Sequence, residues 1–167
     1  ETIVCWREAL KINDAPSFIC LSRQNLPQIS NKKLVSKRFR GAYTIYGSKV
    51  NNDITILATG SEVSLAINVA LNIRSNGVIA KVISMPSTSI FEKQSKNFKN
   101  NLLKSKTSEI FVIEAGSTMY WNKYTKHENI FGLDNFGASA PGNEVFRKFG
   151  LTTKTISSKI LRKIKIK

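Results

Sequence analysis

The chain has 167 residues, which is enough for one domain or for one domain with part of another. Its hydrophobic residues, 41% of the total, can build a core and argue against intrinsic disorder, while no run approaches the ~20 consecutive apolar residues of a membrane helix. The net charge is +15, from 26 Lys and Arg against 11 Asp and Glu, and this excess raises the question of a nucleic-acid partner.

The first 40 residues predict a piece of a domain rather than a complete one. Residues 1–12 place apolar side chains at roughly helical spacing, and residues 17–21 form a continuous apolar run that is typical of a strand buried on both faces. A helix, a strand and a loop cannot bury their own faces, so we interpret residues 1–27 as the end of another α/β domain. The polar and basic stretch 28–40 has the composition of a linker.

From residue 41 onward, strands and helices are expected to alternate to the end of the chain. Strands are predicted at 42–46, 54–58, 78–84, 110–113 and 131–134, and helices at 62–76, 87–94, 97–104, 120–124, 141–149 and 153–165. Strands separated by crossover helices predict an α/β fold, a mostly parallel sheet flanked by helices over residues 41–167.

The cysteines and the histidine narrow the choice of chemistry. Cys5 and Cys20 are too few for a disulfide framework and are not spaced as a metal site. Their apolar neighbours predict two buried, reduced thiols in a cytoplasmic protein. His127 is the single histidine, which argues against most metal sites, and we expect it to be exposed and non-catalytic.

The positive charge does not by itself indicate nucleic-acid binding. The basic residues are 19 Lys and only 7 Arg, whereas base reading and bidentate phosphate binding favour Arg. They are also spread over the chain, without an aromatic-interleaved stripe. We therefore expect no nucleic-acid partner, while attraction of small phosphorylated anions remains reasonable.

Arg23 is the strongest candidate for a binding residue. It follows the predicted strand 17–21, and open α/β sheets bind their ligands beyond the carboxyl ends of their strands. A guanidinium there can hold a phosphate through two parallel charge-assisted hydrogen bonds. An exposed arginine in a domain-end loop is the structural alternative.

Other notable polar and aromatic residues have mainly structural interpretations. The N–H groups at 60–62 could hold an anion, but a helix start with Ser61 as its cap and Glu62 against the dipole is the simpler interpretation. Glu114 ends a strand, where pairing within the structure is favoured over acid–base work. Trp121 is expected to pack rather than to stack on a ligand.

Several blocks of this sequence resemble the transketolase family, in the family's order and over nearly the whole chain. The most specific pair of blocks is Ser22-Arg23-Gln24 followed by Met85-Pro86-Ser87-Thr88. Related thiamin-diphosphate enzymes have a different sequence in the loop after the predicted strand 17–21. The remaining blocks are Glu1-Thr2-Ile3-Val4-Cys5-Trp6, Ala58-Thr59-Gly60-Ser61-Glu62-Val63, Glu114-Ala115-Gly116, Phe136-Gly137-Ala138-Ser139-Ala140-Pro141 and Phe149-Gly150.

The resemblance implies a specific activity. Transketolases transfer a two-carbon ketol unit from a ketose phosphate to an aldose phosphate, in the pentose phosphate pathway, with thiamin diphosphate and a divalent cation (Mg or Ca). In the family, the arginine at the position of Arg23 helps to bind the sugar phosphate. The resemblance further implies that residues 1–27 end the pyrimidine-binding domain and that 41–167 form the transketolase C-terminal domain.

The same resemblance implies what this chain lacks. The family's catalytic, cofactor-binding and metal-binding residues correspond to regions before residue 1, so we assign none here and expect the isolated chain to be inactive. The expected partners are sugar-phosphate substrates, the remainder of a transketolase chain and a second copy in a homodimer, with no nucleic acid and no membrane. The alternatives are part of a dihydroxyacetone synthase, a free-standing regulatory or interaction domain from a split gene, and a basic nucleic-acid-binding module.

Overall fold

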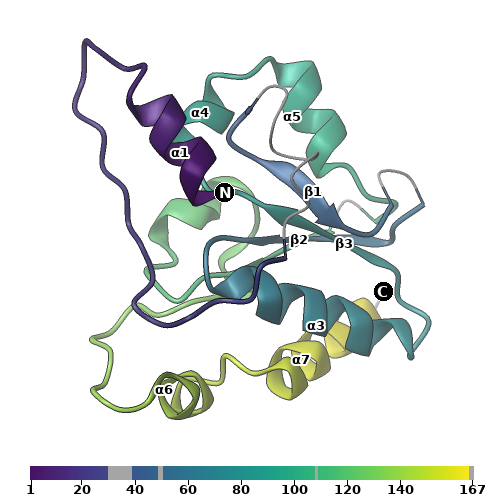
Figure 1. Cartoon of the computed structure of the whole chain (residues 1–167). Helices are drawn as coiled ribbons and strands as arrows, with labels where there is room; N and C mark the ends of the chain where they lie inside the picture. Colours follow the sequence, from purple (N-terminus) through teal and green to yellow (C-terminus); the bar gives the residue numbers. More distant parts are fainter. Residues whose placement is uncertain (30–38, 49–50, 108, 166–167) are drawn as a thin grey trace.

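The computed structural model describes residues 1–29, 39–48, 51–107 and 109–165, and the predicted linker 28–40 lies mostly outside these ranges. Figure 1 shows a sheet with helices on both sides and the first helix beside one end of it. The helices and strands, in chain order, are α1 (Thr2–Ala9), β1 (Tyr43–Tyr46), β2 (Ile54–Ala58), α3 (Glu62–Arg74), β3 (Ala80–Ser84), α4 (Thr88–Glu92), α5 (Lys96–Leu103), β4 (Glu109–Ile113), the 3-10 helices η1 (Met119–Lys123) and η2 (His127–Asn129), β5 (Ile130–Phe131), α6 (Gly142–Lys148) and α7 (Thr153–Lys165).

The sheet has five strands in the order β1-β3-β2-β4-β5. The pairs β2–β3, β2–β4 and β4–β5 are parallel, and β1 pairs antiparallel with β3 at one edge. The predicted mostly parallel α/β sheet is therefore confirmed, with β1 as the exception.

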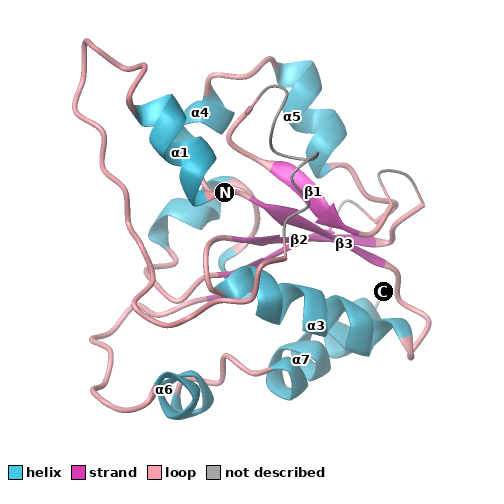
Figure 2. Cartoon of the chain, viewed as in Figure 1, coloured by secondary structure: helices cyan, strands magenta, loops and turns pink. Residues whose placement is uncertain are grey.

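Strands β2 and β3 are buried along their whole length because helices cover both faces of the sheet. Alternate side chains of β2 divide between two apolar clusters, as the two-residue period of a strand requires. Ile56 joins the cluster under α3 and α7, whereas Leu57 joins the cluster under α4 and α5. Figure 2 shows these helix pairs on opposite sides of the strands.

Most elements after residue 41 form where the sequence predicts them. The strand predicted at 131–134 is shorter and begins earlier, as β5, and the helix predicted at 120–124 is the 3-10 helix η1. These two elements contain few residues, so their periodic signals are weak.

The strand predicted at 17–21 is wrong for this chain. Residues 17–21 have no regular secondary structure, and Phe18 is 92% exposed. An apolar run becomes a strand only where neighbouring strands supply ladder hydrogen bonds, and no described strand pairs with this run. The expectation of two buried thiols also fails, since Cys20 in this run is exposed and Cys5 on the helix α1 is only half-buried.

Candidate functional site

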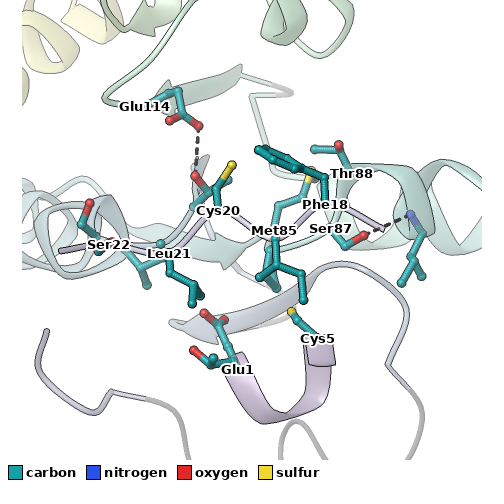
Figure 3. Close-up of a pocket in the computed structure, with 18 of the residues that line it drawn as sticks. Glu1, Cys5, Phe18, Cys20, Leu21, Ser22, Met85, Ser87, Thr88 and Glu114 are labelled. Carbon is teal, nitrogen blue, oxygen red and sulfur yellow. Dashed lines mark hydrogen bonds between the residues drawn. The ribbon is translucent and has the colours of Figure 1, made fainter. Parts of the chain in front are cut away.

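A cavity of about 890 Å³ lies at the carboxyl edge of the parallel strands. One wall comes from the loops that follow β2, β3 and β4, and the other comes from α1 and the segment 16–22. Figure 3 shows Glu1 and Cys5 on the α1 side, Glu114 on the opposite side, and the segment that carries Phe18, Cys20 and Ser22. Open α/β sheets bind ligands at this edge, which makes the cavity the first place to look for a site.

Two carboxylates fix the loops after β2 and β4 against each other. The Thr59 hydroxyl donates to Oε2 of Glu114 at 3.0 Å, and the Ser61 hydroxyl and the Ala115 N–H donate to the Glu62 carboxylate. Burial raises the pKa of Glu62, and burial together with the Glu62 charge raises the pKa of Glu114. These hydrogen bonds run within and between the two loops.

The structural interpretations from the sequence are therefore supported in part. Glu114 is used for pairing within the structure, as expected. Ser61 occupies the N-cap position of α3, but its hydroxyl bonds to Glu62 rather than to a backbone N–H, so it is not a side-chain cap. Trp121 is buried in the cluster with Phe91 and Val112, and His127 is exposed, both as predicted.

Arg23 lies in an exposed stretch directly after the segment 17–21. Within the described part of the chain its guanidinium has no hydrogen bond or ion pair, and it is not among the residues that line the cavity. The structure thus brings Ser61, Glu62 and Glu114 together at the sheet edge and leaves Arg23 apart from them.

One polar contact at this edge was not predicted. Glu1, the N-cap residue of α1, accepts hydrogen bonds from Tyr43 and from Ser84. These residues are 42 and 83 positions away from Glu1, and only the register of the antiparallel β1–β3 ladder brings them together. Periodicity in a single sequence carries no signal for such a register.

The family model described as the transketolase-like TK C-terminal domain matches residues 41–152. The chain belongs to the transketolase family. It is 38% identical to a transketolase of Staphylococcus aureus over 164 residues, which cover 96% of this chain and 25% of that protein. It thus spans about a quarter of the length of the curated relatives it matches, and it corresponds to a C-terminal portion of a transketolase.

Solved structures agree with this assignment. A crystal structure of transketolase from Pichia stipitis in complex with sedoheptulose 7-phosphate matches with a TM-score of 0.85 and 34% identity, over 96% of this chain and 23% of that chain. A protein titled split gene transketolase, inactive beta4 tetramer, matches with a TM-score of 0.70 and 18% identity, over 93% of this chain and 52% of that chain, and shows the common fold alone.

Transketolase relatives imply thiamin diphosphate and a divalent cation in the full enzyme. Among the residues that the structure describes, no three His, Cys, Asp or Glu side chains are grouped so that they could hold a metal ion. Glu62 already accepts a hydrogen bond from Ser61, and Glu114 accepts one from Thr59 in the loop after β2. These described residues therefore supply no set of ligands for the divalent cation. In the same ranges, no helix is long and apolar enough to cross a membrane.

Proposed function

We propose that this chain serves as the C-terminal part of a transketolase that transfers a two-carbon ketol unit from a ketose phosphate to an aldose phosphate. The observation that carries the proposal is the likeness to transketolases over 96% of this chain at 38% identity. Thiamin diphosphate and Mg or Ca would be bound by the remainder of the enzyme, and the isolated chain would be inactive.

The domain organisation follows from the same proposal. The family match over residues 41–152 supports a C-terminal domain that spans 41–167, with a linker at 28–40. Residues 1–27 would complete the pyrimidine-binding domain. Three large apolar side chains in this segment support that view because they are exposed here and need a covering surface: Ile3, Phe18 and Leu21.

Arg23 is the residue that we propose to bind the phosphate of the sugar substrate. Its guanidinium is exposed and engaged with no other described residue, so it is free to form two parallel hydrogen bonds to a phosphate. Binding energy from a phosphate that takes no part in the reaction would help to orient the reacting carbonyl. We further propose a homodimeric enzyme in the cytoplasm.

The test is Arg23→Ala in the complete enzyme, whether it is one polypeptide or is assembled from two. A hydrogen bond to a charged group contributes about 1.5–3 kcal/mol, so the Michaelis constant for phosphorylated donors should rise about tenfold or more. The constant for hydroxypyruvate, which has no phosphate, should change much less. Arg23→Lys should recover only part of the loss because an ammonium lacks the planar fork.

Arg7→Ala is the matched control, since Arg7 is also exposed but already pairs with Glu8. It should leave both Michaelis constants unchanged. Equal losses for phosphorylated and unphosphorylated donors in a folded Arg23→Ala enzyme would show that Arg23 does not bind the phosphate. Ketol transfer by the purified 167-residue chain alone would contradict the proposal that the remaining domains are needed.

A further inference from the structure

A hydrogen-bonded contact joins α1 to the sheet of the C-terminal domain. Tyr43 and Ser84 are Cα partners in the antiparallel ladder between β1 and β3, and residues directly opposite each other in a ladder share one face of the sheet. Their hydroxyls both donate to Oε1 of Glu1, each at 2.5 Å. One carboxylate oxygen at the start of α1 thus receives two hydroxyls that the ladder has already aligned.

The contact is shielded from water. Ser84 has no exposed surface, while Tyr43 and Glu1 are half-buried. Burial, and after it the Glu1 carboxylate, raises the pKa of Tyr43, so the phenol keeps the proton that it donates. Without Glu1, two shielded hydroxyls would lose the acceptor that they share, and a lost acceptor costs most where water cannot replace it.

Among the residues that the structure describes, little else holds helix α1 in place. It has eight residues, none of them buried, whereas isolated helices shorter than ~12–15 residues are marginal in water. Ile3 and Trp6 on its apolar side are 85% and 50% exposed. The place of α1 in this chain therefore depends strongly on the contact that Glu1 makes with β1 and β3.

The position of α1 also bears on Arg23. Residues of α1 and of the segment 16–22 line the same cavity, and residues 10–15 join them. No described strand pairs with the segment itself. A contact that fixes α1 on the sheet therefore fixes the start of the segment that ends at Arg23.

We propose that Glu1 is a positioning residue whose carboxylate latches α1 to Tyr43 and Ser84 and thereby holds the segment that carries Arg23 in place on the C-terminal domain. The latch stands on the geometry of this chain, and only its effect on substrate rests on the proposed function. Through the latch, the C-terminal domain helps to place the phosphate-binding arginine.

The first experiment measures hydrogen exchange by mass spectrometry in the 167-residue chain. In Glu1→Ala, amides of residues 5–9, which donate within α1, should exchange about tenfold faster or more, because the docked helix opens more often, while amides of β2 and β3 keep their rates. Glu1→Gln should recover most of the protection, since its amide oxygen can accept both hydroxyls. Glu8→Ala is the control and should change the rates less than about twofold, because the Glu8 carboxylate on α1 pairs with its neighbours Arg7 and Lys11 and makes no described contact with the sheet.

A double-mutant cycle links the effect to the named partners. Tyr43→Phe should also speed exchange in α1, though less than Glu1→Ala, because the Ser84 hydroxyl still donates to Glu1. Tyr43→Phe should add little to the effect of Glu1→Ala, which already removes the Tyr43 contact. Unchanged exchange in Glu1→Ala, equal acceleration throughout the chain, or fully additive effects would each overturn the latch.

The second experiment tests the link to substrate in the complete enzyme. Glu1→Ala should raise the Michaelis constant for phosphorylated donors several-fold and leave kcat and the constant for hydroxypyruvate unchanged. If α1 loosens but this constant does not move, Glu1 does not position Arg23 and that part of the proposal is wrong. A failure of Arg23→Ala itself to distinguish the two donors would instead count against the proposed function.

Discussion

Residues 17–21 and 54–58 are both apolar pentapeptides, yet they end in opposite environments. Ile54–Ala58 is β2, the central strand, and every one of its residues is buried. Residues 17–21 are irregular and mostly exposed. The difference between them lies in their neighbours, since β3 and β4 flank β2 with parallel ladders and no described strand flanks 17–21. Apolar composition therefore indicates the potential to form a strand, and partner strands decide whether it forms.

The largest expected effect tests this contrast directly. Ile56→Ala removes a side chain with no exposed surface from the cluster under α3 and α7, and should lower the free energy of unfolding by about 2–5 kcal/mol. Phe18→Ala removes a larger side chain that is almost fully exposed, and should change it by less than about 0.5 kcal/mol. Denaturant titration of both variants measures the two values. Similar losses for the two would mean that residues 17–21 are packed in this chain after all.

The second prediction concerns the glycine that opens the compact domain. Gly41 has φ +83°, and a Cβ there would lie 2.3 Å from the Phe91 nitrogen and 2.3 Å from the Ser87 oxygen. Because backbone atoms cannot move aside as a flexible side chain can, Gly41→Ala should destabilise the domain by about 3 kcal/mol or more.

Gly77 provides the matched control for Gly41. It has nearly the same φ, +81°, but no atom lies within 4 Å of the position of a Cβ. Gly77→Ala should therefore cost only the strain of the left-handed backbone, about 1–2 kcal/mol. Equal costs at both positions would show that the close approach of α4 to Gly41 is unimportant.

The same contrast explains what the sequence could predict. Strand β2 is a mostly apolar run and helix α3 carries a periodic apolar pattern. The partners of both lie within the chain, so both form where they are predicted. Cys20 is exposed because the described residues supply no surface that covers it, so local composition predicts its burial wrongly. At the site, the structural pairing of Glu114 could be predicted from its place at the end of a strand. The contact of Glu1 with Tyr43 could not, because it depends on a β-ladder register that periodicity does not encode.

A third prediction compares Glu92, which lies in the C-terminal domain, with Glu8, which lies on α1. Burial opposes ionisation of Glu92, but hydrogen bonds from Tyr124, Lys99 and Lys123 lower its pKa from 4.5 to about 2. A lowered pKa in the folded state contributes stability above the ordinary value, and this contribution is lost as the pH falls from about 4.5 to 2. Glu92→Gln should cost about 1 kcal/mol at pH 7 and progressively less below pH 4.5.

Glu8 on α1 serves as the control for Glu92. Its pKa is also lowered, chiefly by a hydrogen bond from Lys11, but all of its partners lie on or next to the same short helix. Because α1 contributes no buried residue to the core, Glu8→Gln should leave the unfolding of the domain unchanged at every pH. Thermal unfolding between pH 2 and 7 gives both profiles. A flat profile for the difference between wild type and Glu92→Gln would contradict the role assigned to its three partners.

The prediction with the smallest energetic effect tests how exposed residues 17–21 are. Cys20 is exposed, whereas burial and the nearby Glu1 charge raise the pKa of the half-buried Cys5 thiol. Since the thiolate is the reactive form, Cys20 should react with a disulfide reagent at pH 8 about tenfold faster than Cys5. Cys20→Ser should leave only the slow phase and Cys5→Ser only the fast one. In the complete enzyme, where we propose that neighbouring strands cover residues 17–21, the fast phase should become slow. A Cys20 that stays fast there would mean that the run remains uncovered and that residues 1–27 do not complete a buried sheet.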